Sequence, residues 1–545
     1  MLFFARFFSH IHWNGLAVLL FIVAGSAQAY DGECGTMQVI QDIIKNKRNP
    51  FYATTLYRTE KCGAEKYYDS VYTIETQHFQ VMYVLKGPHA TTKAFADSTA
   101  ASMEEAWNLY VNKLHMREPK GFATSHHFQK KVKDGLYPIE IVDIGQINGY
   151  SCSSCYGLTA PPIDNSTATQ IFMDNDFYYG AAANMKRDTV FVNGDTCTYA
   201  KGFVPLQNKA HNFSYPDEWA KGIRLTSFHE LYHAVQLRYL DMSASTFWFE
   251  ASAAGFEEIT NPDIDDYFSY LPTFFYDMGK PLDENFRNYG ASTLFLYLYQ
   301  KVSDKLDKSI WENFSKEPNK PFENQLEKSL KSLKLDADSI FHDYAVRLSF
   351  SGNRSNLINK KDLINDDQPE WPTPRLIVQE NIKPDLPSQA FNFYHNPKKF
   401  VQPDFTDFIG KATVIAFKDG NISIHKIRNT KMLDSLAVIL SASDSTTWIF
   451  SRLGQSESIP IVDISAAPHA FPVPWRQGPL CFAPLPHDKK FIEIRTRRGD
   501  LVSQEKYAGT TYCLQEDQVK SMMAPGVYRF RVGNKGKTTS FIVVH

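Results

Sequence analysis

The chain has 545 residues, which is enough for several domains and a sizeable core. Its 58 lysines and arginines nearly balance 60 aspartates and glutamates, so no positive charge excess favours binding to nucleic acid or to an anionic membrane. Aromatic residues make up 14% of the chain, which argues against a disordered protein.

The N-terminus has the features of a secretory signal peptide. An apolar run at 16–25 follows Arg6 and is too short to span a bilayer comfortably, and Ala27-Gln28-Ala29 forms a small-residue cleavage site. We therefore expect residues 1–29 to be removed and the rest of the chain to be exported, with no membrane span left. The alternative is an N-terminal anchor that stays uncut.

The seven cysteines all follow the predicted signal peptide, in a part of the chain where disulfides are permitted. Proximity along the chain predicts these pairs: Cys34 with Cys62, Cys481 with Cys513, and Cys197 with Cys152 or Cys155. The odd count leaves one thiol over, and spacing alone does not fix the pairing.

The first part of the exported chain predicts a small mixed α/β region. Residues 30–70 show little periodicity and are an N-terminal segment and candidate pro-segment. Apolar runs then predict strands at 78–85, 137–144 and 169–176, and a helix covers 91–114.

A helical half follows. Pro216 opens its first helix, because proline fits a first turn and the acids Asp217 and Glu218 suit the positive end of the helix dipole. Further helices are predicted at 248–259, 289–304, 306–315 and 321–349. Residues 71–365 therefore predict one α+β domain.

The last third changes character. The segment 366–390 is proline-rich and polar and predicts a linker. After it, 391–545 contains β-type runs, "SLAVILSAS" (435–443) among them, split by turn signals such as Asp419-Gly420. This pattern is typical of an all-β, sandwich-like domain of normal size.

The helix after Pro216 contains "HELYH", with His229, Glu230 and His233. Residues four apart on a helix have Cβ atoms about 5–6 Å apart, so the two imidazoles can bind one Zn²⁺. Glu230 would then lie beside the metal, where it can take a proton from a bound water.

The alternative is two histidines packed in a core, because this motif arises by chance in roughly one chain in thirty of this length. The helix pattern favours the metal, since the histidines flank the apolar stripe rather than lie on it. That stripe consists of Leu225, Phe228, Tyr232, Val235 and Tyr239.

A hydrolytic zinc site needs a third protein ligand and one open position. Glu250, in the helical segment "FWFEASAAGFEE", is the candidate, and the small residues after it would allow that helix to pack closely on the first. Glu257 lies seven residues on, hence on the same face, and could orient His229. The alternative for both glutamates is a surface carboxylate.

The combination of HExxH with a downstream aromatic-Glu-Ala segment resembles the gluzincins, zinc metallopeptidases with two histidines and a glutamate as ligands. Over roughly 170–350 it resembles a group of secreted bacterial metalloproteases. One departure is that thermolysin-like enzymes place an aspartate four residues after the glutamate, where this chain has Ala254. The usual aspartate is therefore absent, and Glu250 is a less secure ligand than the histidines.

The resemblance implies a zincin-like domain, one Zn²⁺ per chain and a location outside the bacterial cytoplasm, extracellular or in the cell envelope. It also implies an edge strand for the substrate backbone, for which 169–176 is the candidate. Gluzincins often use a Tyr or His to stabilise the oxyanion; Tyr289 is our candidate, against the alternative that it is one of 28 tyrosines with no such role.

The expected activity is hydrolysis of peptide bonds in a peptide or protein substrate, by a zinc-activated water with Glu230 as general base. A different class is an inactive, peptidase-like binding or adhesion protein that acts through its β-domain. A zinc hydrolase acting on a sugar or an ester is the third alternative.

Overall fold

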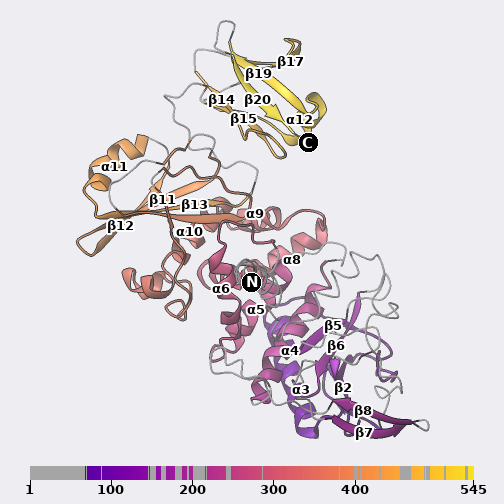
Figure 1. Ribbon diagram of the computed structural model, residues 1–545. Coiled ribbons are helices and arrows are strands. Elements are labelled where there is room, and N and C mark those ends of the chain that lie inside the picture. Colours follow the sequence, from indigo (N-terminus) through magenta and orange to yellow (C-terminus); the bar gives the residue numbers. More distant parts are fainter. Residues whose placement is uncertain are drawn as a thin grey trace, which may run out of the picture. The chain divides into compact units, whose positions relative to one another are not determined.

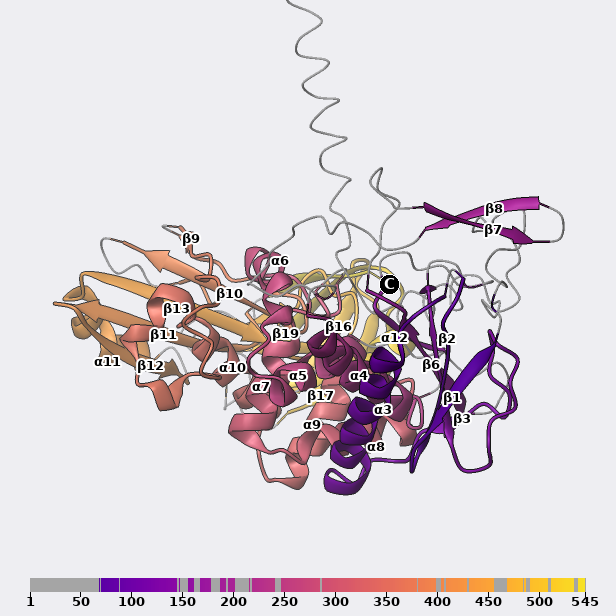
Figure 2. The ribbon, with the colours of Figure 1, turned by 90° about the horizontal axis from the view of Figure 1, so that it is seen from below.

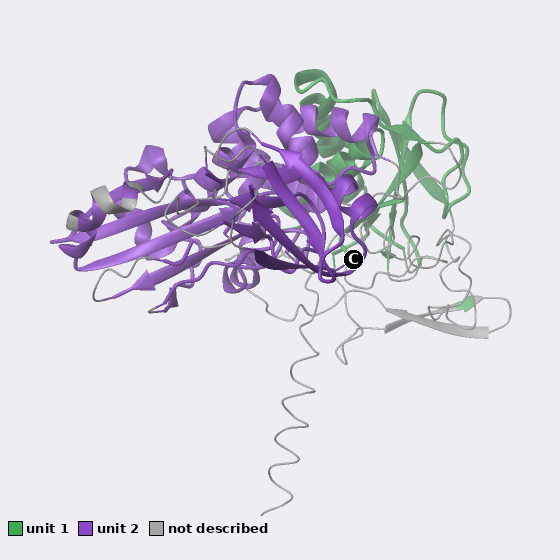
Figure 3. Cartoon of the chain, turned by 90° about the horizontal axis from the view of Figure 1, so that it is seen from above, with its two compact units in different colours: residues 1–209, 214–238 green, residues 210–213, 239–545 purple. Residues whose placement is uncertain are grey.

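The computed structural model describes most of residues 68–544; its longer gaps fall at 148–154, 161–166, 178–186, 201–214, 241–246, 398–402 and 455–467. The predicted signal peptide and the cysteines Cys34 and Cys62 lie outside the described residues, as does nearly all of the candidate pro-segment. Two compact units make up the chain (Figure 3), the first of residues 1–209 and 214–238 and the second of 210–213 and 239–545.

The first unit is built on a mixed sheet with the order β1-β2-β4-β6-β3, in which β5 also pairs with β6. Its strands are β1 (Val71–Glu75), β2 (Phe79–Val84), β3 (Lys120–Gly121), β4 (Tyr137–Val142), β5 (Gly157–Ala160) and β6 (Ala168–Asp174). The inner strands β2, β4 and β6 run parallel, and every residue in them is buried. Burial on both faces explains their nearly continuous apolar sequence, which confirms the three predicted strands.

The position of β6 in the sheet corrects one expectation. β6 has β4 on one side and β3 and β5 on the other, so the prediction that 169–176 forms an edge strand is wrong. Among the described residues, it is the shorter strand β5 that has one neighbour only: it runs antiparallel to β6, with Leu158 opposite Phe172.

Two helices, α3 (Lys93–Trp107) and α4 (Trp219–Gln236), pack side by side against the sheet (Figure 2). The hydroxyl of Thr92 caps α3 by accepting from Phe95 N at 3.1 Å, and the helix continues into a π-helical turn, η3 (Asn108–Lys113). Every residue of α4 from Leu225 to Gln236 is buried. The separate hairpin of β7 (Arg187–Val192) and β8 (Asp195–Ala200) completes the described part of this unit.

The second unit begins with a helical region (Figure 1), whose elements are α5 (Trp248–Thr260), η5 (Asp266–Ser269), α6 (Leu271–Tyr276), α7 (Ser292–Tyr297), η6 (Leu298–Val302), α8 (Leu306–Lys316), α9 (Phe322–Ser332) and α10 (Ala337–Leu348). Gly255 lets α5 approach α7, because a Cβ there would lie 2.1 Å from Cδ1 of Phe295. The single helix predicted at 321–349 is two helices, since Lys334 has a positive φ of 59° and Asp336 caps α10 by accepting from Ser339 N.

A five-stranded sheet follows, in the order β12-β11-β13-β10-β9. Its strands are β9 (Ile377–Val378), β10 (Ala390–Asn396), β11 (Lys411–Lys418), β12 (Asn421–Ile427) and β13 (Ser445–Arg452). The predicted turn at Asp419-Gly420 joins β11 to β12, and both residues have positive φ, as a type I′ hairpin turn requires.

One run predicted as a strand is helical. Residues 435–443 largely belong to α11 (Lys431–Ser441), because Leu436 and Leu440 lie four apart and pack into the core below the sheet. Ile439, between them, is exposed. The predicted linker at 366–390 is also packed in part, since the ring of Trp371 is buried and its Nε1 donates to Tyr267 Oη at 3.0 Å.

The chain ends in two small sheets that share a core of their own. They consist of β14 (His469–Phe471), β15 (Leu480–Ala483) and β18 (Tyr512–Leu514), and of β16 (Phe491–Thr496), β17 (Leu501–Lys506), β19 (Gly526–Val532) and β20 (Thr539–Val543). With α11 and α12 (Glu516–Met522), the C-terminal region is β-rich rather than all-β.

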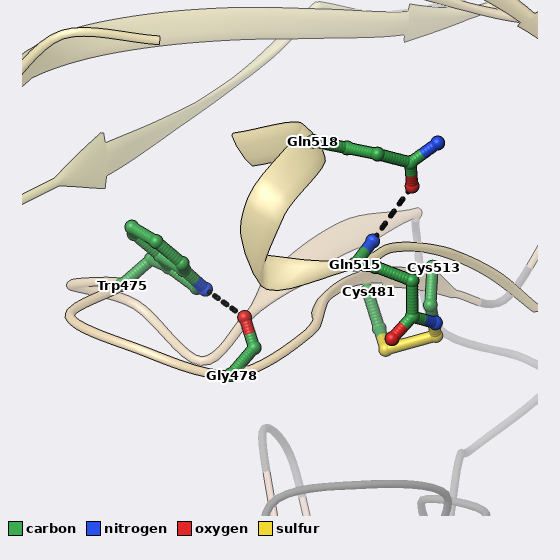
Figure 4. The surroundings of a disulfide bond; sticks show 6 residues. All are labelled: Trp475, Gly478, Cys481, Cys513, Gln515 and Gln518. Atoms are coloured by element: carbon green, nitrogen blue, oxygen red, sulfur yellow. Dashed lines mark hydrogen bonds between the residues drawn. A yellow bond between two sulfur atoms is a disulfide. The ribbon is translucent and has the colours of Figure 1, made fainter. Parts of the chain in front are cut away.

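The disulfide between Cys481 and Cys513 confirms the predicted pair, and joins neighbouring strands β15 and β18 (Figure 4). Beside it, the Trp475 indole donates to Gly478 O at 2.8 Å, and Gln515 N donates to Gln518 Oε1 at the start of α12. Cys155 is also disulfide-bonded, while Cys152 and the side chain of Cys197 lie outside what the structure describes.

Candidate metal centre

His229 and His233 lie one turn apart on α4, both buried, and their rings face each other edge to face. The two Nε2 atoms are 2.9 Å apart. Two nitrogen ligands on a tetrahedral Zn²⁺ would be about 3.3 Å apart at bond lengths of 2.0–2.1 Å, so a small rotation of either ring would make room for the ion. The helix therefore directs both imidazoles at one point, as the sequence predicts.

Gln236 fixes the chemical form of the second histidine. Its Oε1 lies 2.7 Å from Nδ1 of His233, and because an amide oxygen only accepts hydrogen bonds, Nδ1 carries the proton. The lone pair is then left on Nε2, the atom that faces His229. This is the tautomer that a metal ligand needs, held by a hydrogen bond on the far side of the ring.

Glu230 is buried against strand β5. The hydroxyl of Thr159 lies 2.7 Å from Glu230 Oε2 and 2.7 Å from the Glu230 carbonyl oxygen. Gly157, two residues earlier on β5, also faces Glu230, since a Cβ there would come within 2.6 Å of Glu230 Cγ and 2.5 Å of Thr226 Cγ2. Strand β5 thus holds the Glu230 side chain in two ways: the Thr159 hydroxyl bonds its carboxylate, and Gly157 leaves room for its Cγ.

Glu250 lies in the first turn of α5 and is completely buried. One ligand atom from each of His229, His233 and Glu250 lies within 4.8 Å of the other two, so these side chains could hold a metal ion. Two imidazole nitrogens and a carboxylate oxygen are donors that suit Zn²⁺. The donor set thus fits the ion, and the sequence prediction of a metal-binding group holds at this level.

The other two candidate residues stay predictions. Glu257 is buried on α5, seven residues after Glu250 and hence on the same face of that helix. Tyr289 is largely buried just before α7, and its ring stacks on Tyr270 with the centroids 4.5 Å apart. Neither an orienting contact from Glu257 to His229 nor an oxyanion role for Tyr289 follows from these positions.

Three residues of the centre were missed from the sequence. Gln236 lies three residues after His233 on the same helix face, so its spacing was a usable signal. Gly157 and Thr159 come from a strand some seventy residues earlier, and only the antiparallel pairing of β5 with β6 brings them to the helix.

No known protein family matches the chain, and no curated protein does. Among solved structures it is similar to PorZ, a surface component of the type-IX secretion system of Porphyromonas gingivalis, at 20% identity over 18% of this chain and 14% of that chain, with a TM-score of 0.13. It is also similar to a β-1,2-glucanase from Parabacteroides distasonis, at 12% identity over 25% of each chain, with a TM-score of 0.11. Neither likeness bears on the fold or the activity.

Proposed function

We propose that the protein is an exported zinc-dependent peptidase of the gluzincin type, with a zincin-like fold around α4. The observation that carries the proposal is the convergence of the two Nε2 atoms, 2.9 Å apart, with Gln236 bound to the far side of one ring. Histidines that only fill a core have no need of this arrangement.

His229, His233 and Glu250 would hold the zinc, which when bound supplies a Lewis acid and lowers the pKa of a water in its open position. Glu230 would act as general base, taking a proton from the attacking water and returning it to the leaving amine. Thr159, which donates to Glu230, would keep the carboxylate aimed during both transfers.

The strand β5 supports a peptide as the substrate class. It pairs with β6 on one side and, among the described residues, with no other strand. An extended peptide could add to its other edge by main-chain hydrogen bonds, which would place a backbone carbonyl near Glu230. Tyr289 stays the candidate for stabilising the oxyanion, and Glu257 for orienting His229.

Export is part of the proposal. The predicted signal peptide and the disulfides suit an oxidising location, extracellular or in a bacterial cell envelope. In the part of the chain that the structure describes, no helix has the length and apolarity needed to cross a membrane.

The test is zinc content followed by cleavage of a peptide library, on the purified chain and on His233→Ala and Glu250→Gln. We expect about one zinc per chain, no bound zinc in His233→Ala and a lower zinc affinity in Glu250→Gln. Cleavage of the peptide library should require the metal. Zinc binding without cleavage would favour the inactive, peptidase-like binding protein. A chain that takes up no zinc would refute the metal centre and return the histidines to a packing role.

A further inference from the structure

A second cluster of oxygen ligands lies at the other end of α5. Glu258, in the last turn of that helix, meets Asp265 from the following loop and Asp367 from the segment 363–371. One carboxylate oxygen of each lies within 4.8 Å of the other two. Two oxygens that share a Ca²⁺ at 2.3–2.6 Å can be at most about 5 Å apart, so the spacing suits that ion.

In the buried member of this cluster, one carboxylate oxygen meets no hydrogen-bond donor among the described residues. Glu258 is only 4% exposed, and within the described residues its Oε2 accepts no hydrogen bond. Burial raises the pKa of Glu258 to about 10, and the hydrogen bond with Asp367 and the charges of Asp367, Asp265 and Asp263 add to the rise. The three carboxylates repel one another, and a proton on Glu258 relieves this repulsion only in part. A bound cation would neutralise it more fully.

The side chain of Asn365 lies beside Asp367 and carries a neutral oxygen. Its Nδ2 donates to Asp367 Oδ2 at 3.1 Å and lies 3.2 Å from Tyr267 Oη. Its Oδ1 is buried and, among the residues that the structure describes, accepts no hydrogen bond. Carboxylates together with an amide oxygen are the ligand types that Ca²⁺ takes, and the half-buried Asp265 and Asp367 leave room for waters to complete its shell.

We propose that Glu258, Asp265 and Asp367 bind a Ca²⁺ ion that fastens the segment 363–371 to the end of α5. Glu258 and Asp265 belong to one stretch of the second unit, the end of α5 and the loop after it, whereas Asp367 comes from a segment far from both in sequence. Trp371, whose indole donates to Tyr267 Oη, is held in the same place. The site uses none of the residues of the proposed zinc centre, so the inference does not rest on the proposed function.

The experiment is a titration of the full chain, freed of metals and reloaded with one equivalent of Zn²⁺, with Ca²⁺ and separately with Mg²⁺. Isothermal calorimetry gives stoichiometry, and a thermal melt gives Tm. Tb³⁺, which takes the place of Ca²⁺, gives an optical readout, because Trp371 and Tyr267 are close enough to sensitise its emission. We expect one Ca²⁺ per chain, a rise in Tm, and Tb³⁺ emission that Ca²⁺ displaces and Mg²⁺ does not.

Glu258→Gln and Asp367→Asn should each weaken Ca²⁺ binding by about tenfold or more, because each removes a charged ligand. Asp366→Asn is the matched control: it removes the same charge one residue away, from an exposed side chain paired with Lys360, and should bind Ca²⁺ as the unaltered chain does. Equal binding by Asp367→Asn, or the absence of a Ca²⁺ response in the unaltered chain, would overturn the proposal in favour of a proton shared by Glu258 and Asp367. A stronger response to Mg²⁺ would overturn the choice of ion.

Discussion

Two helices of this protein bury histidines, and they treat them in opposite ways. On α10, His342 places Nδ1 2.7 Å from Ser451 Oγ and Nε2 2.8 Å from Thr413 Oγ1, so each ring nitrogen meets a hydroxyl of the sheet that the helix packs on. On α4, His229 and His233 turn Nε2 toward each other, and a side chain of the same helix binds His233 from behind.

The difference is between a histidine whose two ring nitrogens both contact hydroxyl groups and a pair of histidines whose Nε2 atoms face each other. Both ring nitrogens of His342 are hydrogen-bonded to protein hydroxyl groups, and burial keeps the ring neutral by lowering its pKa. The pair on α4 has two nitrogens directed at one point, an arrangement that an ion satisfies better than a single shared hydrogen. Burial alone, which the three histidines share, does not distinguish the two uses.

The largest expected effect is a difference in zinc content between His233→Ala on α4 and His342→Ala on α10. In His233→Ala we expect the zinc content to fall to near zero and peptidase activity by about a thousandfold or more, because two remaining ligands hold zinc poorly. His342→Ala should keep its zinc while losing stability. Zinc content by atomic absorption and unfolding by urea measure both variants, and zinc loss in His342→Ala would erase the contrast.

The next largest effect is expected on peptidase activity when Glu230, the proposed general base, is changed and the proposed zinc ligands are kept. Glu230→Gln preserves the size of the side chain and its contact with Thr159, but the amide cannot take a proton. Activity should fall by about 10²–10⁴-fold while one zinc stays bound. Glu218→Gln, an acid at the start of the same helix and paired with Lys221, is the control and should be fully active. A fully active Glu230→Gln would rule out the assigned base.

A smaller effect is expected from the residue behind the ring. Gln236→Ala removes the acceptor from His233 Nδ1 and should weaken zinc affinity by about 10–100-fold. Gln236→Glu keeps an acceptor at the same place and should restore most of that affinity, which a purely structural role would not explain. Competition with a chromophoric zinc chelator measures both, and equal affinities in all three proteins would contradict the role.

The last expected effect does not involve the proposed zinc centre and is a pH dependence of stability from α10. The pKa of His342 is lowered to about 3: burial is the largest cause, Lys426 and Lys411 also lower it, and Asp343 opposes them. The unfolded side chain titrates near 6.5, so the neutral ring contributes fully to the free energy of unfolding above that pH. This contribution is lost as the pH falls toward 3, by up to about 1.4 kcal/mol per pH unit. Urea unfolding between pH 4 and 7 should show a shallower slope for His342→Gln, and parallel slopes would disprove the contribution.

Local patterns predicted the parts of the fold that depend on near neighbours. The continuous apolar runs of β2 and β4 and the turn at Asp419-Gly420 carry their own signals, and so does the one-turn spacing of His229 and His233. For the same reason the sequence pointed to the ligand group, whose members share a helix or begin the next one.

The features that the sequence could not predict depend on contacts between segments that are far apart in sequence. That β6 is an inner strand follows from its partners β3 and β5, neither of which is marked by the sequence of β6 itself. The contact of Thr159 with Glu230 has the same origin. The helix break at Lys334 is different, because Asp336 is a favoured N-cap residue and the sequence could have predicted that a new helix begins there.

The bare backbone of Gly157 beside Glu230 has a consequence for how this gene can vary. Even alanine there would press on Cγ of Glu230 and on Thr226, whereas at Gly526 of β19 the nearest atoms to a new Cβ are 3.8 Å away. A library of random substitutions selected for activity should therefore return Gly157 almost unchanged and accept alanine at Gly526. Such a library would locate the centre by the substitutions that it excludes.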